Sequence, residues 1–160
     1  MSKSTHQQAP IRSIACWTLS KYIPGLLQFD EDHRFYPEIV QGILNRMEDS
    51  NKSVQQAACS ALSCLIEESR FDIEPYVGDI IDKFVYVYPH YQYTSMGLLH
   101  DVMGTLFETL SSYMNNPVYL DAVMPVLIQR WHALSDDNPS LLQIFECLTS
   151  IAIAIRSGFI

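Results

Sequence analysis

A block of turn-forming residues followed by a long amphipathic stretch returns along this chain at intervals of roughly 40 residues. The turns are Ser50-Asn51-Lys52, Gln92-Tyr93-Thr94 and Asp136-Asp137-Asn138, and they precede residues 54–69, 95–113 and 140–156. A second stretch with helical spacing of apolar residues lies before each turn. Two helices per unit at this period are the signature of HEAT and armadillo solenoids. Such units bury one face against their neighbours and leave another as a continuous binding surface, so the recurrence predicts a protein that holds other proteins.

Apolar periodicity and helix-end residues divide the chain into seven predicted helices. They are expected at about 10–28, 35–48, 53–69, 73–88, 95–114, 117–134 and 140–157. The fold class is therefore all-α, a HEAT-repeat solenoid (right-handed α-α superhelix) of about three and a half repeats over residues 10–160. Residues 1–9 are expected to be a disordered lead-in. Residues 84–88 are rich in β-branched and aromatic types, but their position inside a repeat favours helix over strand.

Composition limits the class of partner. The chain has 160 residues, of which 48% are hydrophobic and 18% charged, so it can bury a core and is not a disordered segment. Its net charge of -8 argues against direct nucleic-acid binding and suits a basic partner. No apolar run approaches the roughly 20 residues that span a bilayer, so no membrane insertion is expected. Neither end has the polar face of a terminal repeat, which predicts part of a longer array.

The sequence patterns of catalytic and metal sites are absent. There is no GxSxG, GxGxxG, phosphate-loop or HExxH motif, and no two histidines stand at an i, i+4 metal spacing. The four cysteines form no CxxC pair, and we expect them to be free, buried thiols: Cys16, Cys59, Cys64 and Cys147. His100 and Asp101 are adjacent, but neighbouring residues on a helix point in different directions. We therefore expect no enzyme, no cofactor and no metal.

Candidate binding residues flank the stripes that we expect to be buried. In the first helix the predicted core stripe is Ile11, Ile14, Ala15, Thr18 and Tyr22, and Trp17 and Lys21 lie one turn apart beside it. The corresponding flanking residues are Ala57, Ser60, Cys64 and Glu67 in the third helix and Asp101, Thr105 and Glu108 in the fifth. A tryptophan ring can hold a proline or apolar side chain, and carboxylates can pair with arginine. A core tryptophan and merely solvated carboxylates remain the alternatives.

Several segments carry a more specific resemblance. They are residues 11–22 (IRSIACWTLSKY), 49–52 (DSNK) with 54–55 (VQ), 57–61 (AACSA), 101–106 (DVMGTL), 124–125 (MP) with 127–129 (LIQ), 146–148 (ECL) and 157–159 (SGF). Over about residues 10–160 the chain resembles the transportins, nuclear import receptors of the karyopherin-beta class. Within that family it resembles the central-to-C-terminal part of the superhelix.

The resemblance implies a segment that binds basic proline-tyrosine nuclear localisation signals of cargo proteins on its concave face. It implies that Trp17 stacks on the proline-tyrosine end of the signal, with Ala57 lining the same pocket and Lys21 beside it. Glu67 and Asp101 would then pair with basic residues upstream in the signal. The partners it implies through the full-length receptor are the small GTPase Ran and nucleoporins, with shuttling between cytoplasm and nucleus.

Two residues depart from the family pattern. Lys21 stands where arginine is common, so a planar bidentate fork is lost. Cys64 stands where threonine is common, so a hydroxyl contact is lost. Both changes are expected to alter cargo preference or affinity. The alternative function is a HEAT-repeat scaffold that binds a folded protein partner without import function.

Overall fold

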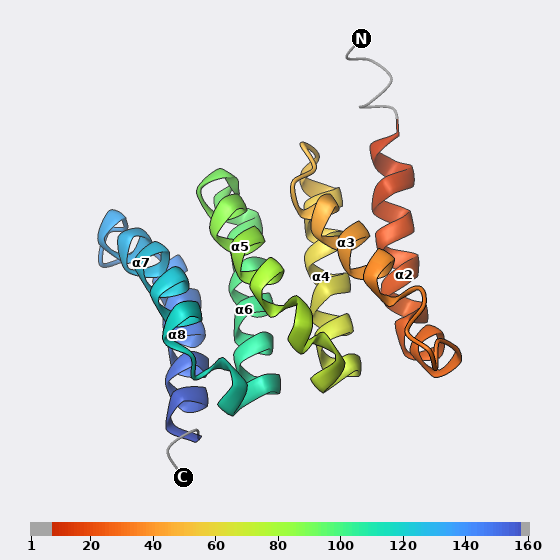
Figure 1. Ribbon diagram of the computed structural model, residues 1–160. Coiled ribbons are helices and arrows are strands. Elements are labelled where there is room, and N and C mark those ends of the chain that lie inside the picture. The colour runs from red at the N-terminus through yellow and green to blue at the C-terminus, as the bar shows by residue number, and fades with distance from the viewer. Residues whose placement is uncertain (1–7, 158–160) are drawn as a thin grey trace. The chain divides into compact units, whose positions relative to one another are not determined.

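The computed structural model describes residues 8–157, which form seven α-helices and two short 3-10 helices and contain no strand (Figure 1). The α-helices are α2 (Ala9–Phe29), α3 (Tyr36–Met47), α4 (Lys52–Ser69), α5 (Val77–Val87), α6 (Tyr93–Met114), α7 (Pro117–Ala133) and α8 (Ser140–Ser157). The 3-10 helices are η1 (Arg70–Tyr76) and η2 (Tyr88–His90). The predicted all-α class of seven helices is confirmed. Of the predicted lead-in, residues 1–7 lie outside the described residues, and Ala9 already belongs to α2.

The chain divides into two compact units, Met1–Ser69 and Arg70–Ile160. In the first unit, α4 packs against both α2 and α3. The buried face of α4 combines small and branched side chains: Val54, Ala58, Cys59, Ala61, Leu62, Leu65 and Ile66. Small residues on a helix face allow the neighbouring backbone to approach closely. The third helix, predicted at about 53–69, corresponds to α4.

The buried face of α2 was predicted wrongly. Ile11, Ile14 and Tyr22 are between 63% and 67% exposed, whereas the buried residues of α2 are Ala9, Cys16 and Ile23. Hydrogen bonds between α2 and α4 hold the smaller residues inward: Ser13 Oγ donates to the Ser53 carbonyl and Cys64 Sγ to the Ser20 carbonyl, both at 3.3 Å. Apolar spacing alone cannot tell which of two faces meets a partner, and here the face with small residues does.

Two aspartates fix the connections of the first unit. Asp30, which is buried after α2, accepts hydrogen bonds from the backbone N–H groups of Arg34 and Phe35 at 2.8 and 3.1 Å. Asp49 accepts two hydrogen bonds from the guanidinium of Arg12, at 2.6 and 3.0 Å, and another from the Asn51 N–H. The Asp49 contacts tie the start of α2 to the turn that precedes α4, and the Asp30 contacts fix the connection from α2 to α3.

In the second unit, α5 packs against α7, and α6 packs against α8. Figure 1 shows the two pairs as two layers of this unit, and η1 contacts both α5 and α6. The fourth helix was predicted to begin near Ile73, but residues 70–76 form η1 and the α-helix begins at Val77. Pro75 explains the difference, because it lacks an N–H and disfavours α geometry in the residue before it. Residues 84–87 are helical, as predicted.

The C-terminal helix α8 is unusually apolar. Within the described part of the chain it is the one helix long and apolar enough to cross a membrane, with a mean hydropathy of 1.3 over 18 residues. A core helix can meet the same criterion. Ile144, Cys147 and Ile151 of α8 are buried in the unit, and Gln143, Glu146 and Ser150 line a pocket against α6. We therefore interpret α8 as a packed repeat helix.

Candidate functional site

The first unit presents an aromatic and basic pair on α2. Trp17 is 59% exposed, so it is a surface residue and not the core tryptophan that its size could also have suggested. The Lys21 Nζ lies 5.5 Å from the centroid of the Trp17 ring, within the range of a cation–π contact. The ring therefore already holds a cation over one face, and an exposed indole beside an exposed lysine can receive a flat or apolar ligand group.

Cys64 of α4 contacts α2 beside this aromatic and basic pair. Its Sγ donates to the Ser20 carbonyl, and the Ser20 Oγ donates to the Trp17 carbonyl at 2.6 Å. Burial raises the pKa of the Cys64 thiol, and the charges of Glu68 and Glu67 raise it further. The thiol is thus protonated at neutral pH and acts as a weak hydrogen-bond donor. Of the other predicted residues, Ala57 is half-buried and Glu67 is exposed on α4.

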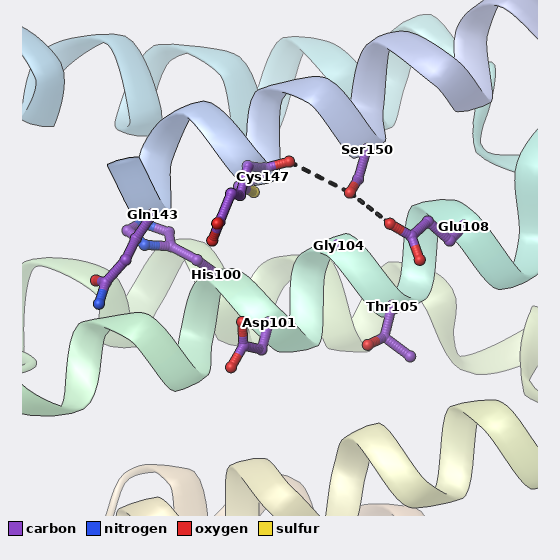
Figure 2. A pocket seen from close by; sticks show the side chains of 9 residues that line it. His100, Asp101, Gly104, Thr105, Glu108, Gln143, Cys147 and Ser150 are labelled. Carbon is purple, nitrogen blue, oxygen red and sulfur yellow. Dashed lines mark hydrogen bonds between the residues drawn. The ribbon is translucent and has the colours of Figure 1, made fainter. Parts of the chain in front are cut away.

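The second unit has an acidic pocket between α6 and α8 with a volume of about 290 Å³ (Figure 2). Three carboxylates from the two helices line it: Asp101 and Glu108 from α6 and Glu146 from α8. The remaining lining residues are His100, Gly104, Thr105, Gln143, Cys147 and Ser150. Figure 2 shows the α6 and α8 residues on opposite sides of the pocket. The described part of the chain brings no cation into this lining.

The two helices approach closely at Gly104. A Cβ atom at this position would lie 3.4 Å from the Ser150 Oγ, which is at the short end of ordinary contact. Ser150 Oγ donates to Glu108 Oε1 at 2.6 Å and also lies 3.3 Å from the Glu146 carbonyl oxygen (Figure 2). One pocket carboxylate, that of Glu108, is thereby held in place by a hydroxyl group.

The electrostatics of the pocket favour a cationic ligand. Burial raises the pKa of Asp101, and the nearby charge of Glu146 raises it further. Two carboxylates that repel one another are both stabilised when a positive charge enters between them. A guanidinium can satisfy two carboxylates at once through its fork of N–H donors. The pocket is therefore suited to an arginine or lysine side chain.

His100 forms the buried floor of the pocket. It is 3% exposed, and its Nε2 lies 2.9 Å from the Tyr88 hydroxyl, while Nδ1 has no hydrogen-bond partner. Burial lowers the pKa of His100 to about 4, and the charge of Arg130 contributes in the same direction. Burial, followed by the charge of Asp101, raises the pKa of Cys147 to about 12. At neutral pH both groups are uncharged, so the only charges of the lining are the three carboxylates.

The sequence identified part of this pocket. Asp101, Thr105 and Glu108 were predicted on one face of the fifth helix, and all three line the pocket. The α8 side, with Gln143, Glu146 and Ser150, was missed, although polar residues three and four apart in an otherwise apolar helix were a usable signal. Trp17, Lys21, Ala57, Cys64 and Glu67 belong to the first unit and Asp101 to the second. Among the described residues, no group of three His, Cys, Asp or Glu side chains could hold a metal ion.

The known proteins that are similar to this chain are transportins and importin beta-2 subunits. The chain is 40% identical over 154 residues to Transportin-1 of Mus musculus and of Homo sapiens, which covers 96% of this chain and 17% of each relative. It is 35% identical over 152 residues to Importin subunit beta-2 of Schizosaccharomyces pombe, which covers 93% of this chain and 17% of that protein. No protein-family model matches the chain. The chain thus spans about one sixth of the length of the curated relatives it matches.

The chain is also 40% identical over 152 residues to Transportin-1 of Oryza sativa subsp. japonica. Relatives from animals, a fungus and a plant thus match nearly the whole chain. The resemblance that the sequence motifs indicated is therefore confirmed. The chain is a homologue of the transportin and importin beta-2 proteins and corresponds to one segment of their HEAT-repeat array.

Proposed function

We propose that this chain is a cargo-binding segment of a nuclear import receptor and binds basic proline-tyrosine localisation signals. The exposure of Trp17 is the observation that carries the proposal, because burying an indole is strongly favourable and a surface indole is available to a ligand. In this proposal Ran and nucleoporins are partners of the longer receptor, which shuttles between cytoplasm and nucleus.

The first unit would receive the proline-tyrosine end of the signal. A proline or tyrosine ring can stack on the Trp17 indole once Lys21 swings aside, and the Lys21 ammonium then remains beside the ligand. Ala57 and Cys64 provide a small, weakly polar floor on α4 that does not obstruct an extended chain. Proline-rich or extended peptides bind aromatic surfaces in this way with little loss of conformational entropy.

The acidic pocket of the second unit would receive a basic side chain of the signal. Asp101, Glu108 and Glu146 supply the charge, and Glu108 is held by Ser150. The neutral His100 lies at the base of the pocket with its Nδ1 unused. A guanidinium entering the pocket would lower the pKa of Asp101, which burial and Glu146 now raise.

A scaffold that binds a folded protein is the second candidate function. It is favoured by the exposed apolar face of α2, where Ile11, Ile14 and Phe29 are 63–90% exposed. Apolar patches of this kind are typical of protein contact surfaces. This function would not require a proline-tyrosine motif in the partner.

A fluorescence-anisotropy titration separates the two functions. The probe is a labelled basic peptide that ends in Arg-x-x-Pro-Tyr, beside the same peptide with Ala-Ala in place of Pro-Tyr, each at low and high salt. We expect selective, salt-sensitive binding, and we expect Trp17→Ala to weaken it about tenfold, as loss of an aromatic anchor typically does. Equal binding of both peptides would contradict the proposal.

Matched variants make the test specific. Phe29→Ala removes a more exposed aromatic residue of the same helix and should leave peptide affinity unchanged. Asp101→Asn should weaken binding several-fold at low salt and less at high salt, whereas Asp121→Asn on the exposed face of α7 should not. Circular dichroism checks that each variant is folded.

A further inference from the structure

The second unit has another pocket, between η2 and α7, with a volume of about 270 Å³. Its lining is Tyr88, Pro89, Val126, Gln129, Arg130 and Ala133, and we call it the Arg130 pocket. It shares no lining residue with the acidic pocket. The proposed binding of a basic peptide involves none of these lining residues.

Arg130 is half-buried without a counter-charge. Its Nε atom is inaccessible to solvent and has no hydrogen-bond partner, and within residues 8–157 it forms no ion pair with a carboxylate. A partly buried charge without a partner costs free energy, and pairing it with an anion recovers that cost. The position is therefore electrostatically prepared for a negative group that the described chain does not supply.

The charge of Arg130 is felt by the neighbouring buried pair. Burial is the main cause of both pKa shifts, raising the pKa of Tyr88 and lowering that of His100. The charge of Arg130 acts to lower the pKa of both groups. Tyr88 lines the Arg130 pocket, and its hydroxyl is hydrogen-bonded to His100. Arg130 and the Tyr88–His100 pair thus meet at this pocket, where Tyr88 and Arg130 share the lining.

We propose that the Arg130 pocket binds the carboxylate of an acidic side chain, Asp or Glu, in a protein segment whose adjacent residue is apolar. The guanidinium offers a fork of donors that matches a carboxylate, and the Gln129 amide lies in the same lining. Pro89, Val126 and Ala133 form an apolar wall for the adjacent side chain. A chain of net charge -8 with a single arginine in the pocket disfavours a polyanion such as nucleic acid.

The test uses nuclear magnetic resonance titration of the chain with a blocked Glu-Leu-Glu-Leu peptide, beside the same peptide with Gln for Glu. We expect the Glu peptide to shift the Arg130 Nε–H signal and to bind about tenfold more tightly than the Gln peptide, which is the usual gain of a charge-assisted pair. The His100 pKa should rise when the peptide binds, because the carboxylate offsets the nearby positive charge.

Variants locate the effect. Arg130→Gln should abolish the preference for Glu, whereas Arg156→Gln removes the same charge from an exposed position of α8 and should leave it within about twofold. Arg130→Lys keeps the charge but not the fork, and it should weaken binding of the Glu peptide about threefold while the chain remains folded. Trp17→Ala should have no effect, since it lies in the other unit.

Three results would overturn the proposal. They are equal affinity for the Glu and Gln peptides, equal losses in the Arg130 and Arg156 variants, and an unchanged Arg130 signal at saturation. If Arg130→Gln does not fold, Arg130→Lys decides: an affinity for the Glu peptide equal to that of the unmodified chain contradicts the pocket.

Discussion

Acidification should destabilise the second unit through His100. The pKa of this histidine is lowered to about 4 in the folded chain, first by burial and then by Arg130, against an ordinary value of 6.5. Between these values the unfolded chain binds a proton that the folded chain does not. The free energy of unfolding therefore falls as the pH falls from about 6.5 to about 4. A difference of about 2.5 pKa units corresponds to about 3 kcal/mol.

The assay follows urea unfolding of this unit between about pH 4 and pH 8. Trp131 provides the signal, because it lies in α7 and packs against Phe145 with 4.3 Å between ring centroids. Trp17→Phe removes the other tryptophan of the chain, so fluorescence then reports the second unit alone. The same titration is run with His100→Gln, which can keep a hydrogen bond to the Tyr88 hydroxyl.

The difference between the two profiles isolates His100 from every other titrating group. At about pH 8 the variant should be less stable, because its side chain fills the site less well. Toward about pH 4 the parent chain should lose about 3 kcal/mol more than the variant. His132→Gln, in an exposed position of α7, controls for the loss of a histidine. Parallel profiles for the parent and His100→Gln would refute the reasoning.

Three further predictions concern stability. Asp49→Asn should cost about 2 kcal/mol at neutral pH by weakening its charged hydrogen bonds with Arg12. Burial raises the pKa of Asp49, but hydrogen bonds from Arg12 and Asn51 lower it below its ordinary value. In acid unfolding this difference should therefore shrink as the pH falls below about 4 and vanish once the pH is below the lowered pKa. Asp30→Ala should cost about 2 kcal/mol in urea unfolding, because the backbone N–H groups of Arg34 and Phe35 lose the buried carboxylate that accepts from them, whereas exposed Asp32→Ala should cost little. Ser111 has φ 28 and ψ −97 inside α6, a conformation that glycine adopts more readily than serine. Ser111→Gly should therefore increase the free energy of unfolding by about 1 kcal/mol and raise the melting temperature, while Ser112→Gly should lower it.

The fold was largely predictable because helix patterns are local. The side chains of Asn51 and Asn138 accept hydrogen bonds from N–H groups at the starts of α4 and α8, and Pro117 begins α7. The start of α5 was harder to predict from the sequence, since Pro75 allows a 3-10 turn that the apolar spacing does not reveal. The buried face of α2 could not be predicted either, because which face is buried depends on packing against α4 and not on the hydrophobicity of α2 itself.

The candidate site was predictable only where one helix carries the signal. Trp17 with Lys21, and Asp101 with Glu108, each lie on one helix, so their spacing places them on a common face. Glu146 enters the acidic pocket only because α8 lies beside α6. Arg130 is a comparable case, since its lack of a counter-charge depends on residues from several elements. Pairing between helices is a tertiary property that periodicity does not encode.

The thiol of Cys64 gives this chain a natural selectivity toward alkylating reagents. Cys16, Cys59 and Cys147 are buried, whereas Cys64 is half-exposed beside the surface that carries Trp17 and Lys21. Because its pKa is raised by burial and by Glu68 and Glu67, its reaction should quicken as the medium becomes alkaline. A fluorophore attached there would sit against α2 at Ser20, about one helical turn from Trp17, without any engineered cysteine. A peptide covering Trp17 would shield the sulfur, so the alkylation rate itself would report occupancy of the aromatic surface.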